Sequence, residues 1–347
     1  MSINNVILET QAAGSGAGDI HVNAAVSWNA ATELTLKAHN NININADISA
    51  ADNNGKLHLI YGQNTANSNA NYYLNHGAKV NLKAGDNFST QKGTDAVKNY
   101  KVITALGAQG STTQTDLQGI NGNLIGNYVL GADIDAAATS GWNAGAGFNP
   151  IGNNTTNFSG ILDGLGHTIS NLTINRPTTD YVGLFGRTNG ASIRNIGLLG
   201  GSVKGNGSVG GLVGYNNSSI SNAYATGSVT GSYSVGGLVG ENYGGISNAY
   251  ATGAVTGSDI TGGLTGMNWG GISNAYATGS VTGQIDVGGL VGANGNIISN
   301  AYATGSVTGD IFVGGLVGES NGGISNAYWN KETTGQLSGV GQGFNAG

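Results

Sequence analysis

A repeat without insertions or deletions dominates the C-terminal part of the chain, from Val209 to Tyr328. Each unit holds a glycine-rich motif, first seen as Val209-Gly-Gly-Leu-Val-Gly, and then Ile-Ser-Asn-Ala-Tyr. The leucines of the first motif recur every 26 residues, at Leu212, Leu238, Leu264, Leu290 and Leu316. The tyrosines of the second motif keep the same spacing, at Tyr224, Tyr250, Tyr276, Tyr302 and Tyr328. A fixed period of this length is typical of solenoids, propellers and other repeat arrays.

The length and composition of the unit select one of these architectures. Propeller blades and helical repeats are longer, at about 33 residues or more. The unit is rich in Gly, Ser, Thr and Val and lacks the periodicity of an amphipathic helix. Two or three short strands joined by glycine turns fit into it. The sequence therefore predicts an all-β fold, a single-stranded parallel β-helix solenoid of about 14 coils and about 65–70 Å in length.

Stacking of identical coils explains why the period is kept without exception. Each residue lies above its equivalent in the next coil, and an insertion within a strand would turn the following side chains to the opposite face. Strand alternation places Ala249 and Ala251 on one face and Asn248 and Tyr250 on the other. We expect the alanines to point inward, because a narrow coil has little room for tyrosine. Asn248 and its equivalents are expected at a bend, with their amides bonded along the stack.

Less regular sequence precedes the repeat and is also predicted to be β-structure. The segment from Asp19 matches the segment from Asn41, and both alternate apolar and polar residues as half-buried strands do. A conventional β-sandwich remains an alternative for this part. The predicted sections are irregular coils at 1–90, an excursion with a possible short helix near Asp116 at 91–126, imperfect lead-in coils at 127–201, and regular coils with the C-terminal end at 202–347.

Composition limits the possible partners and location. The net charge is −6 and no basic stripe is present, which argues against binding to nucleic acid. The chain has no cysteine, no run of about 20 apolar residues that would span a membrane, and no apolar segment after Met1 typical of a signal peptide. We interpret the sequence as a segment of a longer exported protein, located outside the cell or on its surface.

The repeated Val-Gly-Gly-Leu-Val-Gly units resemble GLUG repeats. The lead-in through Asp133-Ile-Asp, Pro150-Ile-Gly and Phe158 is similar to the segment that precedes such repeats in bacterial surface proteins. These include IgA-peptidase-type proteins and filamentous-haemagglutinin-like exoproteins of two-partner secretion, and the N-terminal coils resemble the second group more. The resemblance implies a right-handed β-helix with an adhesive role. The His-Glu-x-x-His motif of a zinc peptidase is absent, so no peptidase chemistry is expected.

The tyrosine column is the strongest candidate for a binding site. The five rings recur at the spacing of the coils, so they would form an exposed aromatic strip able to bind sugar faces or a protein partner. The same rings could instead only stack on each other and shield the sheet. The column comprises Tyr224, Tyr250, Tyr276, Tyr302 and Tyr328.

A polysaccharide lyase or hydrolase is the enzymatic alternative, because β-helices often host such activities. The histidines are scattered and show no metal-ligand spacing, so neither a metal nor a cofactor is expected. Asp163 and His167 could converge with Arg187 or Arg194 from later coils, although Asp163-Gly also has the form of a tight turn. Asp259, Asp286 and Asp310 share a loop but not a column. Glycosidic hydrolysis usually needs two carboxyl groups at about 5–10 Å.

The sequence therefore predicts a structural or adhesive rod without enzymatic activity. Its expected partner is a glycan or protein on a host or neighbouring cell. Two alternatives remain open. One is a carbohydrate-binding module or a polysaccharide-cleaving β-helix enzyme, and the other is a subunit that assembles end to end into a filament, because open end strands invite pairing.

Overall fold

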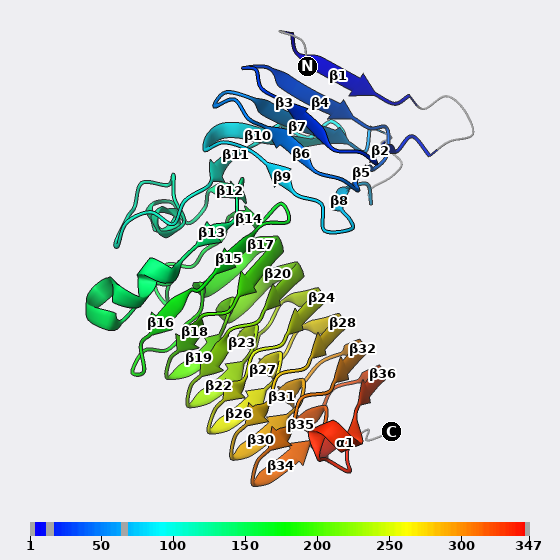
Figure 1. Cartoon of the computed structure of the whole chain (residues 1–347). Helices are drawn as coiled ribbons and strands as arrows, with labels where there is room; N and C mark the ends of the chain where they lie inside the picture. Colours follow the sequence, from blue (N-terminus) through cyan, green and yellow to red (C-terminus); the bar gives the residue numbers. More distant parts are fainter. Residues whose placement is uncertain (1–3, 12–16, 64–68, 344–347) are drawn as a thin grey trace.

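The chain winds into an elongated β-solenoid of about 13 turns with very little helix (Figure 1). The computed structural model describes residues 4–11, 17–63 and 69–343. The predicted all-β solenoid is confirmed. It has slightly fewer coils than expected because the lead-in coils are long. Tyr128 pairs with Leu162, and Leu162 pairs with Ile193, which are wider spacings than the 26 residues of the regular unit.

The N-terminal section has three faces, each formed by one parallel sheet. The first face contains β1 (Val6–Glu9), β4 (Glu33–Lys37), β7 (Lys56–Tyr61) and β10 (Gly85–Lys92). The second contains β2 (Ile20–Val22), β5 (Ile42–Ile44) and β8 (Tyr72–Leu74). The third contains β3 (Val26–Trp28), β6 (Ile48–Ala50) and β9 (Val80–Asn81). Alternate apolar residues such as Leu57 and Leu59 are buried between the faces.

Strand direction reverses once, where β10 turns back into β11 (Lys98–Ile103). These two strands pair antiparallel, and every later strand of the long sheet pairs parallel with its predecessor, beginning with β12 (Asn127–Leu130) and β14 (Ile161–Asp163). At the same place, the face of the sheet that points into the core changes to the opposite face. Val102 on β11 belongs to the N-terminal core, whereas Ile103 beside it belongs to the C-terminal core. Val129 and Leu130 divide between the two cores in the same way.

The solenoid therefore has two sections that use opposite faces of one shared sheet. Because both the strand direction and the inner face are exchanged, the two sections wind with the same hand. Figure 1 shows β11 and β12 between the blue N-terminal section and the green-to-red C-terminal section, which are offset from each other. The sequence analysis did not predict this division.

The lead-in coils carry two helical segments. Two 3-10 helices, η1 (Gln118–Gly122) and η2 (Ala137–Gly145), lie in long connections. The Asp116 carboxylate accepts a hydrogen bond from the backbone N–H of Gly119 at 2.7 Å, just as η1 begins. The strands of this part are β13 (Ile134–Asp135), β15 (Thr168–Ser170) and β16 (Thr173–Asn175).

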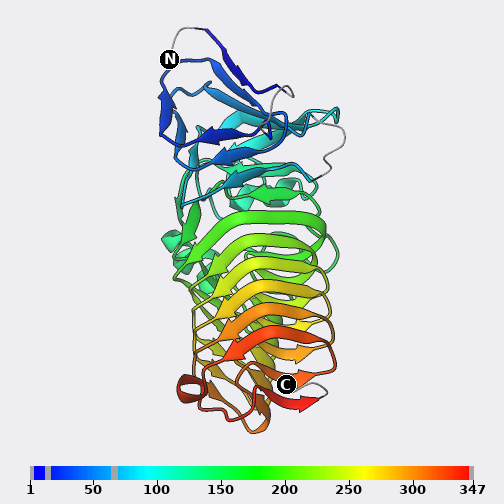
Figure 2. The ribbon, with the colours of Figure 1, turned by 90° about the vertical axis from the view of Figure 1, so that its right-hand side faces the viewer.

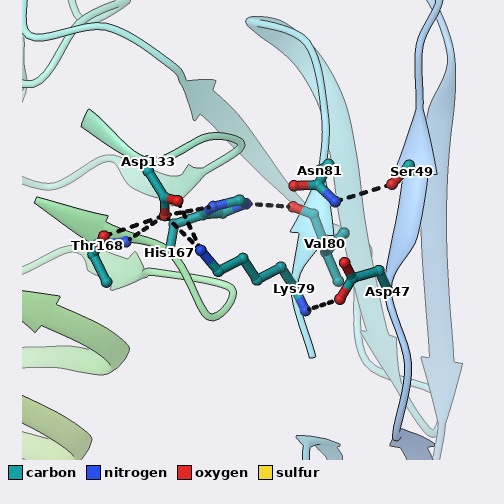
Figure 3. Close-up of polar contacts among 8 residues, drawn as sticks. All are labelled: Asp47, Ser49, Lys79, Val80, Asn81, Asp133, His167 and Thr168. Atoms are coloured by element: carbon teal, nitrogen blue, oxygen red, sulfur yellow. Dashed lines mark hydrogen bonds and ion pairs between the residues drawn. The ribbon is translucent and has the colours of Figure 1, made fainter. Parts of the chain in front are cut away.

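A polar network joins the two sections at the end of the third face (Figure 3). Lys79 donates to Asp133 at 2.7 Å, and His167 donates from Nε2 to the carbonyl oxygen of Val80 at 3.0 Å. Asp133 also accepts from the backbone N–H of Thr168 at 2.9 Å and lies 3.2 Å from Nδ1 of His167. Burial alone would raise the pKa of Asp133, but hydrogen bonds from Lys79, Thr168 and His167 lower it to about 2. The carboxylate therefore stays ionised and holds both sections.

The regular section stacks in-register coils that Figure 2 shows as evenly spaced rungs. The long sheet continues through β17 (Phe185–Leu199), β20 (Val213–Ala225), β23 (Val239–Asn242), β24 (Gly245–Ala251), β27 (Thr265–Asn268), β28 (Gly271–Ala277), β31 (Val291–Asn294), β32 (Ile298–Ala303), β35 (Val317–Ser320), β36 (Ile324–Trp329) and β37 (Val340–Gly343). A second sheet adds β18 (Ser202–Lys204), β21 (Ser228–Thr230), β25 (Val255–Thr256), β29 (Val281–Thr282) and β33 (Val307–Thr308) to β16. The third contains β19 (Gly207–Gly210), β22 (Tyr233–Gly236), β26 (Asp259–Gly262), β30 (Ile285–Gly288) and β34 (Ile311–Gly314). The one described α-helix, α1 (Lys331–Thr334), follows β36.

The predicted inward and outward positions of the repeat are confirmed. Ala249 and Ala251 are buried, and Tyr250 lies on the outside. Asn248 has a left-handed backbone with φ of 50°, which marks the expected bend. Its side-chain amide donates to Asn222 at 3.1 Å and accepts from Asn274 at 3.2 Å.

A second asparagine ladder runs inside the coils, where the sequence analysis did not expect one. Each amide donates to the side-chain oxygen of its equivalent one coil further on, at 2.8 to 3.2 Å. The ladder consists of Asn216, Asn242, Asn268, Asn294 and, in the last position, Ser320. Buried amides are costly without partners, so the ladder both satisfies them and favours this register over any other.

Candidate functional site

Four tyrosines of the predicted column form a continuous stack on the outer face of the regular coils. The ring centroids of Tyr224 and Tyr250 lie 4.7 Å apart with planes inclined by 4°. Tyr276 and Tyr302 extend the stack at 4.7 and 4.9 Å. Tyr328, the fifth member, pairs with Tyr302 in the sheet and is 68% exposed. The spacing of the coils thus brings the predicted residues together.

Stacking determines which parts of these tyrosines a ligand could reach. Each inner ring is covered on both faces by its neighbours, and the first ring, that of Tyr224, also packs over Gly197. Burial, followed by the neighbouring tyrosines, raises the pKa of Tyr250, so its hydroxyl remains protonated at neutral pH. The stack therefore offers ring edges and a row of hydroxyl groups, which donate and accept hydrogen bonds, in place of open ring faces.

A shallow groove lies on the same strands, on the other side of the asparagine bend. Its volume is about 410 Å³ and its floor includes Gly245 and Gly271, which have open space where a Cβ would stand. Serine hydroxyls line it at the same position of successive coils, at Ser221, Ser247, Ser273 and Ser299. One coil later, Ile297 occupies the position equivalent to Gly271, so the row of glycines along the floor ends there.

Two exposed aromatic residues lie in the turns that lead into the strands of this groove, and the sequence analysis did not select them. Tyr243 and Trp269 each precede a floor glycine by two residues, and Trp269 is 50% exposed. The Trp269 ring packs against the backbone of Gly295 in the next coil, where a Cβ would overlap it. Tyr243 in turn stacks on Tyr215, with ring centroids 5.0 Å apart, so each of the two rings has one covered face and remains about half exposed. Little in the sequence indicated these two residues, because Tyr243 and Trp269 lie in a tract that varies between units.

Asp163 and Arg194 meet as predicted, but His167 and Arg187 do not join them. Arg194 donates from Nε to Asp163 at 2.7 Å. His167 instead contacts Asp133 and Val80, and Arg187 lies over the ring of Tyr215 at 4.2 Å.

Asp163 is a structural carboxylate at the junction of the two sections. It is fully buried and also accepts from the Tyr72 hydroxyl at 2.6 Å, from the side chain of Asn195 and from the backbone of Leu165. Burial, and then the charge of Asp163, raises the pKa of Tyr72 well above its usual value, so the phenol remains a donor. A carboxylate with four donors and no exposure is poorly placed for acid–base catalysis.

Among the acidic residues of the regular coils, Asp286 has the most perturbed environment. Burial raises its pKa to about 6, and the carboxylates of Glu319 and Asp259 add to the shift. The part of the chain that the structure describes contains no cluster of three or more His, Asp or Glu side chains suited to a metal ion.

We expect Asp286→Asn to stabilise the protein at pH 7.5 but not at pH 4. The ordinary pKa of 3.8 applies to the unfolded chain, so the folded state holds this proton more tightly. The protonated Asp286 side chain therefore contributes stability that is fully present below about pH 4 and is lost as the pH rises through about 6. Thermal unfolding midpoints at both pH values test this, with the exposed Asp310→Asn in the equivalent turn of the next coil as the control. An equal effect of Asp286→Asn at both pH values would contradict it.

Comparison with known proteins agrees with the repeat architecture. Residues 205–230, 231–256 and 283–308 match a family model described as the GLUG motif. The regular coils contain GLUG repeats. The intervening coil departs from the pattern, because Thr261 and Thr265 replace the valines found at 235 and 239. The finer expectation, a filamentous-haemagglutinin-like exoprotein of two-partner secretion, stays a prediction.

Two curated proteins are similar to part of the chain. Halomucin of Haloquadratum walsbyi is 48% identical over 120 residues, which is 33% of this chain and 1% of Halomucin. A provisionally named Gly-rich membrane protein of Evansella cellulosilytica is 38% identical over 101 residues, which is 28% of this chain and 12% of that protein. The similarity thus spans only a small fraction of either relative. None of the helices described here has the length and apolarity to span a membrane.

One solved structure resembles a larger part of the chain. It is a crystal structure of a Bacteroides ovatus protein provisionally named as an immunoglobulin A1 protease. The match has a TM-score of 0.52 and 25% identity, and it covers 66% of this chain and 75% of the other. The GLUG repeats and the solenoid are thus both found in known proteins.

Proposed function

We propose that this chain is a rod segment of an extracellular bacterial surface protein that serves adhesion and has no catalytic role. The observation that carries the proposal is the unbroken column of equivalent side chains along the regular coils. A rod with such columns offers the same weak contact several times, and repeated weak contacts give strong overall attachment. The names of the relatives, a halomucin and a membrane protein, agree with a location at the cell surface. Export by two-partner secretion is part of this proposal.

The partner that this surface suits best is a glycan chain. The groove has serine hydroxyls along its length, and the partly exposed rings of Tyr243 and Trp269 lie in the turns before its strands. Beyond the asparagine bend lies the row of tyrosine hydroxyls. Hydroxyl groups together with partly exposed aromatic rings are suited to the polar edges and apolar faces of sugar rings. A protein on a neighbouring cell is the other partner in this proposal.

We expect the double variant Tyr243→Ala/Trp269→Ala to lose at least about tenfold in affinity for any glycan that the chain retains on a glycan array. Tyr250→Ala/Tyr276→Ala should also weaken binding if the hydroxyl row takes part. The matched control is Tyr73→Ala, which removes a similarly exposed ring from the N-terminal section. Circular dichroism verifies that each variant is folded. If the unmodified chain bound neither glycans nor intact cells, that result would contradict the adhesive role.

End-to-end assembly is a second candidate, favoured by the last regular coil. Ile311 and Phe312 are both apolar and exposed there, whereas each earlier coil has at least one polar residue at these two positions, as in Tyr233-Ser, Asp259-Ile and Ile285-Asp. Light scattering across a range of concentrations separates the two proposals. A filament subunit grows in mass with concentration, whereas a single rod keeps the mass of one chain.

A further inference from the structure

A cleft separate from the outer face of the GLUG coils lies at the junction of the two sections. It has a volume of about 280 Å³ and is enclosed by the β10–β11 hairpin on one side and by β14 and β17 on the other. The residues that line it and bear on its chemistry are Tyr61, Lys92, Lys98, Tyr100, Ser192 and Arg194. The cleft exists only because the hairpin reverses the strand direction and places the outer face of the second section against the end of the first.

Arg194 is the central cationic group of the cleft and has unused hydrogen-bonding capacity. Its side chain is 18% exposed, its Nε donates to Asp163, and its guanidinium lies over the ring of Tyr72 at 4.4 Å. Within residues 4–11, 17–63 and 69–343, no acceptor contacts Nη1 or Nη2 of Arg194. A guanidinium presents five N–H donors, and two parallel donors suit a carboxylate. The fixed plane of Arg194 is therefore ready to bind such a group.

The charges around the cleft favour an anion. Asp163 behind the wall offsets the charge of Arg194, while Lys92 and Lys98 outnumber Asp95 at the rim. This local excess of positive charge occurs in a chain whose net charge is −6. Cationic groups in a concave surface attract anionic ligands from solution, and the attraction weakens as salt is added.

The remaining wall suits a sugar ring better than a bare ion. Thr90 and Tyr100 share a hydrogen bond between their hydroxyl groups at 3.3 Å, and Ser192 adds a third hydroxyl. Tyr61 also lines this wall and is 8% exposed. The volume is close to the lower end of the roughly 300–1,000 Å³ found for small-molecule sites, so one sugar unit would fill it.

We propose that the junction cleft binds a carboxylate-bearing sugar unit, with its carboxylate on the free Nη groups of Arg194, its ring hydroxyls on the hydroxyl groups of Thr90 and Ser192, and Lys98 at the entrance. The site is independent of the glycan groove on the GLUG coils. The sugar is either a free uronate or the end of an acidic polysaccharide, since both present the same carboxylate and ring.

Isothermal titration calorimetry of the whole chain with four probes tests the proposal. Glucuronate is expected to bind saturably and about tenfold or more tightly than glucose, which lacks the charge, and than acetate, which lacks the ring. A glucuronate-terminated oligosaccharide distinguishes the source, because a chain-end site binds it more tightly than the monosaccharide and a site for free uronate binds it less. Equal affinities for glucuronate and glucose, or no saturable binding of either glucuronate probe, would overturn the proposal.

Two variants that leave Arg194 in place keep the test independent of folding. Lys98→Glu reverses a rim charge on an exposed side chain, and Ser192→Leu fills the cleft. Both are expected to weaken glucuronate binding about tenfold or more. Trp269→Ala, which changes an exposed side chain of the GLUG coils outside the cleft, should leave it unchanged. Unaltered binding in both cleft variants, or its loss in Trp269→Ala, would show that the cleft is not the site.

Discussion

Gly270→Ala is expected to destabilise the regular coils by about 3 kcal/mol or more. A Cβ at this position would overlap the carbonyl oxygen of Gly244 in the preceding coil and also the amide of Asn242. Both groups belong to the stacked framework, because the Gly244 carbonyl accepts from the Asn242 amide at 3.1 Å and that amide also donates to Asn268 in the next coil at 2.8 Å. Equilibrium unfolding in urea, followed by circular dichroism, measures the loss.

The neighbouring residue provides the matched control. Gly271 has the same side chain and lies one position further on, but a Cβ there meets no atom within 4 Å. Gly271→Ala should therefore change the free energy of unfolding by no more than about 0.5 kcal/mol. Similar losses in the two variants would mean that the coils are not stacked as closely as the structure shows.

The second large effect is expected from Arg194→Met, at about 3–5 kcal/mol of lost stability. The change leaves the Asp163 carboxylate fully buried without its cationic partner. The remaining hydrogen-bond donors to Asp163, among them the Tyr72 hydroxyl at 2.6 Å, are neutral. They offset only part of the free energy needed to keep the unpaired carboxylate buried. Because this cluster joins the two sections, thermal unfolding should also separate into two transitions if the sections come apart.

Arg187→Met is the control for this change, since Arg187 lies on the same strand, β17. Its guanidinium contacts the Tyr215 ring and donates to Asn154 at 2.7 Å, both at the surface. The expected loss is about 1 kcal/mol. If Arg194→Met cost no more than Arg187→Met, the junction would owe little to its buried ion pair.

The period of the sequence was sufficient to predict most of the regular section. Because coils stack without insertions, a residue that recurs every 26 positions must form a column, and both Tyr250 and Asn248 do so. The inner ladder through Asn242 and Asn268 was equally visible in the spacing. It was missed because asparagine in a variable tract is usually interpreted as loop sequence.

The junction could not be predicted in the same way. Tyr72 and Asp163 lie 91 positions apart in sequence, and their hydrogen bond depends on the reversal between β10 and β11. The reversal leaves little trace in the pattern of the chain, because strands alternate apolar and polar residues in either direction. Burial on both faces of β12 and β14 was the available signal, in runs such as Tyr128-Val-Leu, which are apolar throughout.

Cross-linking between adjacent coils tests the central claim most directly, which is that the GLUG units stack as parallel rungs in exact register. The chain has no cysteine, so pairs of cysteines can be introduced freely. Ser247 pairs with Ser273, and Ser273 with Ser299. A short thiol-specific linker should join Ser247→Cys to Ser273→Cys efficiently within one chain, but should not join Ser247→Cys to Ser299→Cys, which lie two coils apart. Equal cross-linking of the two pairs would contradict the stacked solenoid.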